Sequence, residues 1–291
     1  MTKILDGISL SCKMLEELKE QLALLEGRAP TLAAVLTSDN MASMTYVSKK
    51  VAACRQVGIA SKVIHTSPRD TQELVSLIQS LNVDHSIDGI LLQLPVPTHI
   101  DLRSVIEHVD PNKDVDGFHP LNVGKVLLGD TSAFYPCTPL GIMALLAHFG
   151  IQVETKHVVI VGRSNIVGKP LASILLQNAP GCNATVTVAH KSTQHLEDIC
   201  KTADILVAAC GKPHIITADM VKEGAVVVDV GINKIEDPSK KVGYRLVGDV
   251  DFQNVVKKVS AITPVPGGVG PMTIAMLLKN TYTAFLRKTN P

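Results

Sequence analysis

Two polar side chains lie one helical turn apart in a segment that is otherwise spaced like an amphipathic helix. Tyr46 and Lys50 are separated by four residues, so both project from one face of the helix predicted for 41–57. Apolar residues that include Val47 and Cys54 form a stripe beside them. Loss of hydration at such an edge lowers the pKa of a lysine, which makes it usable as an acid or base. The alternative is a lysine that extends to water beside a packed tyrosine.

A third candidate follows a strand. Gln93 comes directly after a short buried strand predicted for 90–92, and Pro95 and Pro97 stop that strand. Ligands bind outside the carboxyl ends of strands in open α/β sheets, so Gln93 is a candidate binding residue. A glutamine that only caps a strand end is the alternative.

An aspartate-rich loop supplies the next candidate. Asp110, Asp114 and Asp116 fall in one short segment, but their spacing does not fit an EF-hand calcium loop. A carboxylate fixed in such a loop can bind a ring with several N–H donors, such as an aminopyrimidine. Solvated turn chemistry is the alternative. It fits Asp116 less well than Asp110, because the apolar neighbours Val115 and Phe118 indicate an ordered loop.

A nucleotide-binding pattern opens the second half of the chain. After a strand predicted for 157–161, Gly162-Arg-Ser-Asn-Ile-Val-Gly168 leads into a helix. Strand, glycine turn and helix together form a phosphate cradle. The match to G-x-G-x-x-G is incomplete, because Ser164 stands at the second glycine position and Gly168 comes one residue late.

The next predicted strand, 184–189, distinguishes between cofactors. NAD sites usually place an acid after this strand to hold the ribose 2′-hydroxyl. This chain has Lys191 and Ser192 there, and Arg163 in the first turn. Positive charge with hydroxyl groups favours the 2′-phosphate of NADP. A solvated Lys191 in an ordinary loop is the alternative.

Three prolines and three glycines crowd the segment between Pro264 and Pro271. This density is incompatible with a helix or strand, so a rigid, backbone-rich loop against a flat ligand is predicted over 263–273. An ordinary crossover between domains is the alternative.

Repeated strand–turn–helix units indicate a parallel, doubly wound α/β fold. Strands are predicted at 31–36, 60–65, 90–92, 157–161, 184–189 and from Ile205 and Ala225; helices at 10–25, 41–57, 70–81, 140–149 with Thr138 as cap, and 272–286.

Composition narrows the class of protein. The length of 291 residues favours two domains. The balance of 28 Lys plus Arg against 27 Asp plus Glu gives no electrostatic case for a nucleic-acid or membrane partner, and the aromatic content of 3% argues against a base-stacking surface. The six cysteines form no C-x-x-C pair, so neither a metal site nor a disulfide framework is predicted. No targeting segment is evident, and a cytoplasmic protein is expected.

Seven segments are shared with one family. They are Tyr46–Lys50, Ile87–Pro95, Lys113–Pro120, Cys137–Pro139, Gly162–Gly168, Asp229–Asn233 and Thr263–Thr273. Through them the chain resembles the bifunctional methylenetetrahydrofolate dehydrogenase/methenyltetrahydrofolate cyclohydrolase family nearly end to end. The resemblance implies NADP-dependent oxidation of 5,10-methylenetetrahydrofolate, then hydrolysis of the methenyl product to 10-formyltetrahydrofolate.

The resemblance also implies an architecture. Two α/β domains flank a cleft, and the second is a Rossmann-type doubly wound parallel sheet. The expected folate-binding catalytic domain is 1–138, with a C-terminal helix at 272–291 packing back on it. The expected NADP-binding domain is 139–271, and a homodimer forms through it.

Site residues follow from the same resemblance. The catalytic set is Lys50, Tyr46, Gln93 and Asp116. Tetrahydrofolate derivatives are expected to contact these and Leu94, Pro95, Pro266, Gly267, Gly268, Pro271 and Thr273. NADP is expected to contact Gly162, Arg163, Ser164, Ile166, Val167, Gly168, His190, Lys191, Ser192, Thr193, Cys210, Gly211, Gly231 and Ile232.

Lys50 indicates the subtype, because family members that are dehydrogenases only tend to lack this lysine. Two other hypotheses remain at the level of sequence. One is a two-domain dehydrogenase of the shikimate or malate type, and the other is a non-catalytic protein that senses NADP.

Overall fold

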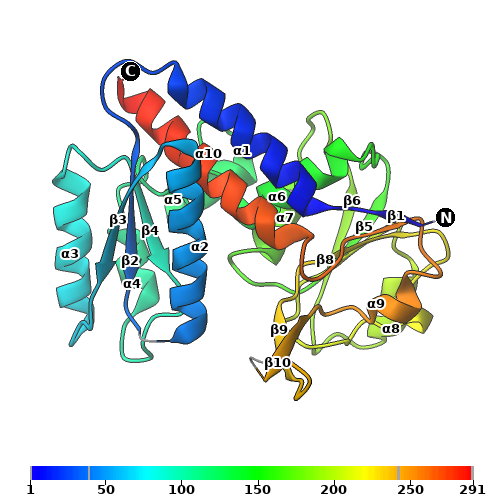
Figure 1. Ribbon diagram of the computed structural model, residues 1–291. Helices are drawn as coiled ribbons and strands as arrows, with labels where there is room; N and C mark the ends of the chain where they lie inside the picture. The colour runs from blue at the N-terminus through cyan, green and yellow to red at the C-terminus, as the bar shows by residue number, and fades with distance from the viewer. Residues whose placement is uncertain (1, 39, 241–242, 290–291) are drawn as a thin grey trace. The chain divides into compact units, whose positions relative to one another are not determined.

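The computed structural model describes residues 2–38, 40–240 and 243–289, which form two compact units. One unit joins the chain up to Ser11 with Thr138–Thr273, and the other joins Cys12–Cys137 with the chain from Ile274 onward. Figure 1 labels the elements. In chain order they are β1 (Lys3–Ile4), α1 (Gly7–Ala23), β2 (Thr31–Leu36), α2 (Met41–Val57), β3 (Ala60–His65), α3 (Thr71–Val83), β4 (Gly89–Gln93), α4 (Leu102–Glu107), α5 (Pro120–Leu128), α6 (Cys137–His148), β5 (His157–Val161), α7 (Gly168–Leu175), β6 (Thr185–Ala189), α8 (Leu196–Lys201), β7 (Ile205–Ala208), the 3₁₀ turn η1 (Ala218–Met220), β8 (Val226–Asp229), β9 (Asn233–Glu236), β10 (Tyr244–Val247), α9 (Phe252–Val255), β11 (Ala261–Ile262) and α10 (Val269–Thr289).

The unit that contains Cys12–Cys137 is built on a parallel sheet with strand order β3-β2-β4. The central strand β2 is apolar along its length because helices cover both faces of the sheet. Figure 1 shows α3 and α2 on opposite sides. Val35, Ile78 and Ile90 belong to the core on the α3 side. The register pairs Leu36 with Gln93, so both strands end at the same level.

A buried ammonium group closes the end of α3 in this unit. The Lys113 Nζ donates to the carbonyl oxygens of Leu81 at 2.9 Å, Asn82 at 2.6 Å and Asp84 at 2.9 Å. The last carbonyls of a helix have no partner within the helix, so the lysine satisfies them. Burial lowers the pKa of Lys113.

The C-terminal part of α10 holds a loop of the same unit. The Asn280 Nδ2 donates to the Val115 carbonyl at 2.8 Å and to the Tyr135 carbonyl at 3.1 Å. The Arg287 guanidinium lies 4.5 Å from the centre of the Phe134 ring. These contacts bring the end of the chain onto the segment that surrounds Asp116.

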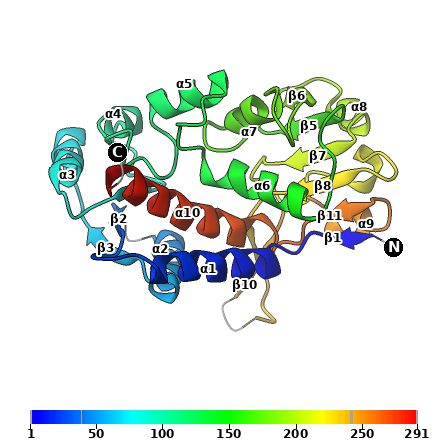
Figure 2. The ribbon, with the colours of Figure 1, turned by 90° about the horizontal axis from the view of Figure 1, so that it is seen from above.

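The other unit contains a six-stranded parallel sheet with order β1-β11-β8-β7-β5-β6. Figure 2 shows β1 and β6 at opposite edges. The strand order reverses at β5, which has β6 on one side and β7 on the other. Ligands of doubly wound sheets bind at such a switch point, outside the carboxyl ends of the strands.

Several predicted boundaries agree with the structure. The bounds of β2, α2, β3 and β5 are those expected from the sequence. The prediction of a loop over 263–273 is wrong in its second half, because α10 begins at Val269. The first turn of a helix has N–H groups without partners, so Pro271 is tolerated there.

Two further expectations differ from the structure. Thr138 does not cap a helix, because α6 begins at Cys137, and the Thr138 hydroxyl lies 3.1 Å from the Thr273 hydroxyl. Strand β1 pairs with β11, so the described residues before Ser11 join the sheet of the second half, not the domain expected for 1–138. Residues 1, 290 and 291 of the expected segments lie outside the described residues. No helix within the described part of the chain is long and apolar enough to span a membrane.

Candidate active site

The half-buried Lys50 meets Gln93 at the carboxyl end of β4. The Lys50 Nζ donates to the Gln93 Oε1 at 3.0 Å, and the Gln93 Nε2 donates to the Leu94 carbonyl at 2.7 Å. The amide of Gln93 is thus held at both ends, and it directs the lysine. Helix α2 supplies the lysine and β4 supplies the glutamine, so packing of α2 on the sheet sets the contact.

The loop that carries Asp116 is held by a different aspartate. The buried Asp114 carboxylate accepts the backbone N–H groups of Phe118 at 3.1 Å and His119 at 2.8 Å. It also accepts the Asn122 Nδ2 at 2.8 Å. Buried carboxylates require such partners. Asp114 therefore fixes the loop and leaves Asp116 for another purpose.

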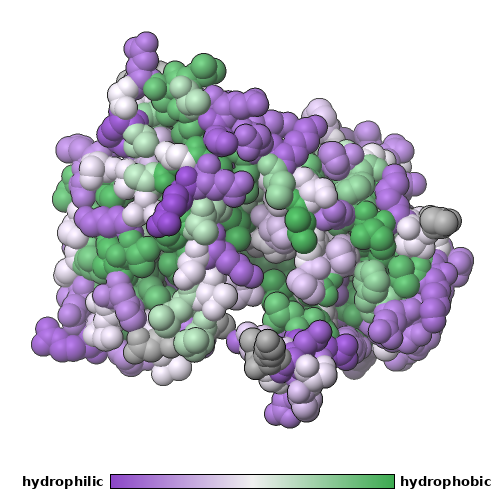
Figure 3. All heavy atoms as spheres, in the orientation of Figure 1, coloured by the Kyte–Doolittle hydropathy of each residue, from purple (hydrophilic) through white to green (hydrophobic). Residues whose placement is uncertain are grey.

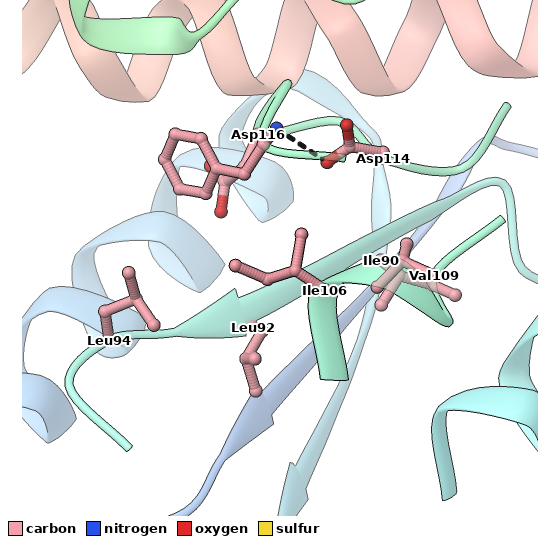
Figure 4. A pocket seen from close by; sticks show the side chains of 8 residues that line it. Ile90, Leu92, Leu94, Ile106, Val109, Asp114 and Asp116 are labelled. Atoms are coloured by element: carbon pink, nitrogen blue, oxygen red, sulfur yellow. Dashed lines mark hydrogen bonds between the residues drawn. The ribbon is translucent and has the colours of Figure 1, made fainter. Parts of the chain in front are cut away.

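Asp116 is half-buried, and its carboxylate points into a pocket whose walls are mainly apolar (Figure 4). The pocket is lined by Ile90, Leu92, Leu94, Ile106, Val109, Asp114, Asp116 and Phe118. Withdrawal from water raises the pKa of Asp116 to about 6, while the charge of Lys50 acts in the opposite direction. The lysine and the aspartate are therefore close enough to interact electrostatically.

Two more side chains lie beside Lys50 and Asp116. Tyr46 lies one turn before Lys50 on α2 and is 38% exposed, so its ring is accessible to a ligand. The buried Cys137 Sγ lies 4.0 Å from the Asp116 Oδ1. Burial and the charge of Asp116 keep the pKa of the Cys137 thiol well above its ordinary value. The thiol therefore stays protonated and contributes packing and weak hydrogen bonds.

The glycine turn that is expected to hold the cofactor phosphates lies between β5 and α7. A Cβ atom on Gly168 would lie 2.0 Å from the Gly162 carbonyl oxygen, and one on Gly162 would lie 2.1 Å from the Ala209 carbonyl oxygen. Only glycine permits these approaches. The Ser164 hydroxyl accepts the Val167 N–H at 3.2 Å, which shapes the turn at the start of α7. The residues present thus fit a dinucleotide.

The loop after β6 is folded by its own side chains. The His190 N–H donates to the Thr193 hydroxyl at 2.9 Å, and the Ser192 N–H donates to the His190 Nδ1 at 3.2 Å. Lys191, Ser192 and Arg163 are exposed. His190 and Thr193 therefore shape the loop and leave the charged and hydroxyl side chains of Lys191, Ser192 and Arg163 exposed.

Residues expected to contact the cofactor also follow β7 and β8. Gly211 and Ile232 are exposed there, and Cys210 is half-buried. The buried Asp249 accepts the N–H groups of Cys210 and Gly211 at 2.6 and 2.9 Å. Burial raises the pKa of the neighbouring Asp229 to about 7. Neither carboxylate was predicted to have a site role, because nothing in the local spacing links it to these turns.

The predicted glycine-rich loop is attached to the start of α1. The Gly267 carbonyl accepts the N–H groups of Gly7 at 2.9 Å and Ile8 at 3.1 Å. Pro266 is exposed, while Gly267 and Gly268 are buried. Among Pro266, Gly267 and Gly268, which were expected to contact the substrate, Pro266 is therefore the accessible residue.

Hydrophilic and hydrophobic side chains are interspersed over the face in Figure 3. Across the ranges that the structure describes, no three His, Cys, Asp or Glu side chains gather as metal ligands. The sequence did not predict that Asn122, Asn280 and Asp114 support the loop of Asp116, although Asp114 lies in the same aspartate-rich segment.

Family models match most of the chain. Residues 5–116 match the tetrahydrofolate dehydrogenase/cyclohydrolase catalytic domain, and residues 136–289 match the NAD(P)-binding domain of the same name. A bifunctional protein FolD from Protochlamydia amoebophila is 54% identical over 288 residues, 99% of each chain. One from Campylobacter curvus is 56% identical over 96% of this chain and 94% of its own.

Solved structures agree with these matches. The bifunctional FolD methylenetetrahydrofolate dehydrogenase/cyclohydrolase from Campylobacter jejuni has a TM-score of 0.93 and 49% identity, covering 99% of this chain and 100% of its own. The Trypanosoma brucei enzyme, solved with NADP and an inhibitor, has a TM-score of 0.94 and 38% identity, covering 100% and 99%.

Proposed function

The chain belongs to the tetrahydrofolate dehydrogenase/cyclohydrolase family, and we propose that Lys50, Tyr46, Gln93 and Asp116 carry its folate chemistry. It is a bifunctional enzyme that oxidises 5,10-methylenetetrahydrofolate with NADP and hydrolyses the methenyl product to 10-formyltetrahydrofolate. The observation that carries the residue assignment is the 3.0 Å contact of Lys50 with Gln93, within electrostatic reach of Asp116.

Asp116 is the group that holds the pterin ring. The ring presents an amino group and a ring N–H side by side, and an ionised carboxylate offers two acceptor oxygens to them. The Asp114 hydrogen bonds to Phe118 and His119 hold the loop in place. Tyr46 packs against the aminobenzoyl ring, and Leu94 and Pro95 border the substrate beside Gln93.

The oxidation step depends mainly on positioning. The folate nitrogens stabilise the cation that remains when hydride leaves the bridging carbon, so no strong base is needed. NADP, when bound, supplies the nicotinamide carbon that accepts the hydride. Gly162 and Gly168 admit the cofactor backbone, and Arg163, Lys191 and Ser192 hold the 2′-phosphate.

The hydrolysis step needs proton transfer. Water adds to the methenyl carbon and loses one proton, which leaves a hydroxyl group on that carbon. The hydroxyl group then loses its proton and becomes the formyl C=O as the bond from the carbon to N5 breaks and N5 takes up a proton. Lys50 is the group that moves these protons, and Gln93 fixes the position of its Nζ. The net products are 10-formyltetrahydrofolate and one proton.

Replacing Lys50 by Met tests this assignment. We expect Lys50→Met to lower the kcat/KM of methenyltetrahydrofolate hydrolysis by about 100-fold or more, because general acid–base catalysis is lost. Hydride transfer to NADP should persist, because it uses no base. Both rates are followed in one spectrophotometric assay.

The matched control is Lys49→Met, which removes a neighbouring exposed lysine of α2. It should leave both activities intact. Hydrolysis that survives in Lys50→Met would refute the role of Lys50.

The raised pKa of Asp116 predicts a pH dependence of folate binding. The carboxyl is ionised above pH 6 and accepts the two ring N–H groups, whereas below pH 6 it is protonated. We expect the Kd of tetrahydrofolate, measured by calorimetry, to rise about tenfold between pH 7 and pH 5. Asp116→Asn should bind weakly across this range without the same slope. A wild-type Kd that is independent of pH would contradict the assignment.

A homodimer through the NADP-binding unit is the second part of the proposal. Strand β6 lies at the edge of its sheet, and β5 is its neighbour among the described strands. Val188 of this strand and nearby Leu176 are 39% and 58% exposed. An open edge with apolar side chains favours pairing with a second copy. Sedimentation equilibrium should give twice the 31.1 kDa chain mass, and a monomer mass would rule the dimer out.

We further infer that the enzyme works in the cytoplasm. The structure has six free cysteines, of which Cys12 is exposed. Free thiols persist in a reducing compartment. Cell fractionation tests this, and recovery from an oxidising compartment would contradict it.

A further inference from the structure

Asp249 is a fully buried carboxylate that accepts four hydrogen bonds. Its Oδ2 accepts the backbone N–H groups of Cys210 at 2.6 Å and Gly211 at 2.9 Å. Its Oδ1 accepts the Lys212 N–H at 3.0 Å and the Asn233 Nδ2 at 2.9 Å. The residue is 0% exposed, so the charge depends on these donors alone.

The four donors belong to two separate turns. Cys210, Gly211 and Lys212 form the turn after β7, and Asn233 begins β9 after the turn that follows β8. Strands β7 and β8 are neighbours and lie on the same side of the switch point of the six-stranded sheet. One carboxylate therefore ties together two turns at the carboxyl ends of neighbouring strands.

A second carboxylate places Asp249 itself. The Asp229 Oδ1 accepts the Asp249 N–H at 2.9 Å and the Gly231 N–H at 3.0 Å, and its Oδ2 accepts the Val250 N–H at 3.0 Å. The Asp229 N–H donates to the Thr263 hydroxyl at 2.7 Å. A continuous set of hydrogen bonds thus runs from the turn after β7 to the start of the proline- and glycine-rich loop.

Two glycines pack closely against these carboxylates. A Cβ atom on Gly248 would lie 1.7 Å from the Asp229 Oδ2, and one on Gly231 would lie 2.1 Å from the Asp249 Oδ1. The two glycines therefore make the space that the two carboxylates fill. An asparagine at 249 would keep one acceptor oxygen and turn an NH₂ group toward N–H donors.

We propose that Asp249 is a positioning residue for NADP, which holds the turns after β7 and β8 in the arrangement that binds the cofactor. The inference rests on the proposed assignment of Cys210, Gly211, Gly231 and Ile232 to the cofactor site. Asp249 acts through the backbone and has no part in the hydrolysis of the methenyl substrate, which requires no NADP.

Asp249→Asn separates these roles. We expect the KM for NADP to rise about tenfold or more in the dehydrogenase assay, which corresponds to loss of about 1.4 kcal/mol of binding. The kcat at saturating NADP should fall less than the KM rises. Hydrolysis of methenyltetrahydrofolate without NADP should stay within about twofold of wild type, because Lys50, Gln93 and Asp116 lie in the other unit. An unchanged KM for NADP would overturn the proposal.

The matched control is Asp251→Asn, two positions along the chain. Its carboxylate accepts the exposed Asn254 Nδ2 at 2.6 Å and touches neither turn. We expect wild-type kinetics from it. A KM shift equal to that of Asp249→Asn would show a general effect of charge and overturn the proposal.

A milder variant covers the case in which Asp249→Asn does not fold. Asn233→Ala removes one of the four donors at a half-buried position, and we expect the KM for NADP to rise about threefold with hydrolysis unchanged. An unchanged KM would again overturn the proposal. Wild-type protein that fails to reduce NADP with methylenetetrahydrofolate would instead refute the proposed function.

Discussion

Buried carboxylates that accept backbone N–H groups are the interaction on which the loops of both units depend. Asp114 holds the loop of Asp116, and Asp249 with Asp229 holds the turns at the ends of β7 and β8. A buried charge is costly unless donors surround it, so each carboxylate imposes one arrangement on its loop. The loops are thereby shaped before a ligand arrives, which lowers the ordering cost of binding.

In each unit, polar side chains have two different roles. Some hold a loop in place through hydrogen bonds, and others remain available to bind a ligand. The Asp114 carboxylate accepts hydrogen bonds from the chain, whereas the Asp116 carboxylate points into the pocket. His190 and Thr193 fold their loop, whereas Lys191 remains exposed. The side chains available for chemistry are therefore those that do not hold their own loop together by hydrogen bonds.

The sequence predicted those features that depend on short spacing. The bounds of β2 and α2 followed from apolar runs and helical periodicity, and the Lys50–Gln93 contact joins residues that the sequence had marked separately. The role of Asp249 could not be predicted, because its donors are far along the chain and contact it only after the sheet forms. The sequence did not predict that α10 starts at Val269. Proline and glycine usually interrupt a helix, but the first helical turn tolerates them.

Hydrogen exchange tests most directly whether buried carboxylates hold the loops of the ligand-free protein. The amides of Phe118, His119 and Cys210–Lys212 lie outside helices and strands, yet each donates to a buried aspartate. We expect their exchange to be at least about 100-fold slower than in an unstructured peptide. Exchange at the rate of an unstructured peptide would show that the loops are ordered by ligands and would contradict this account.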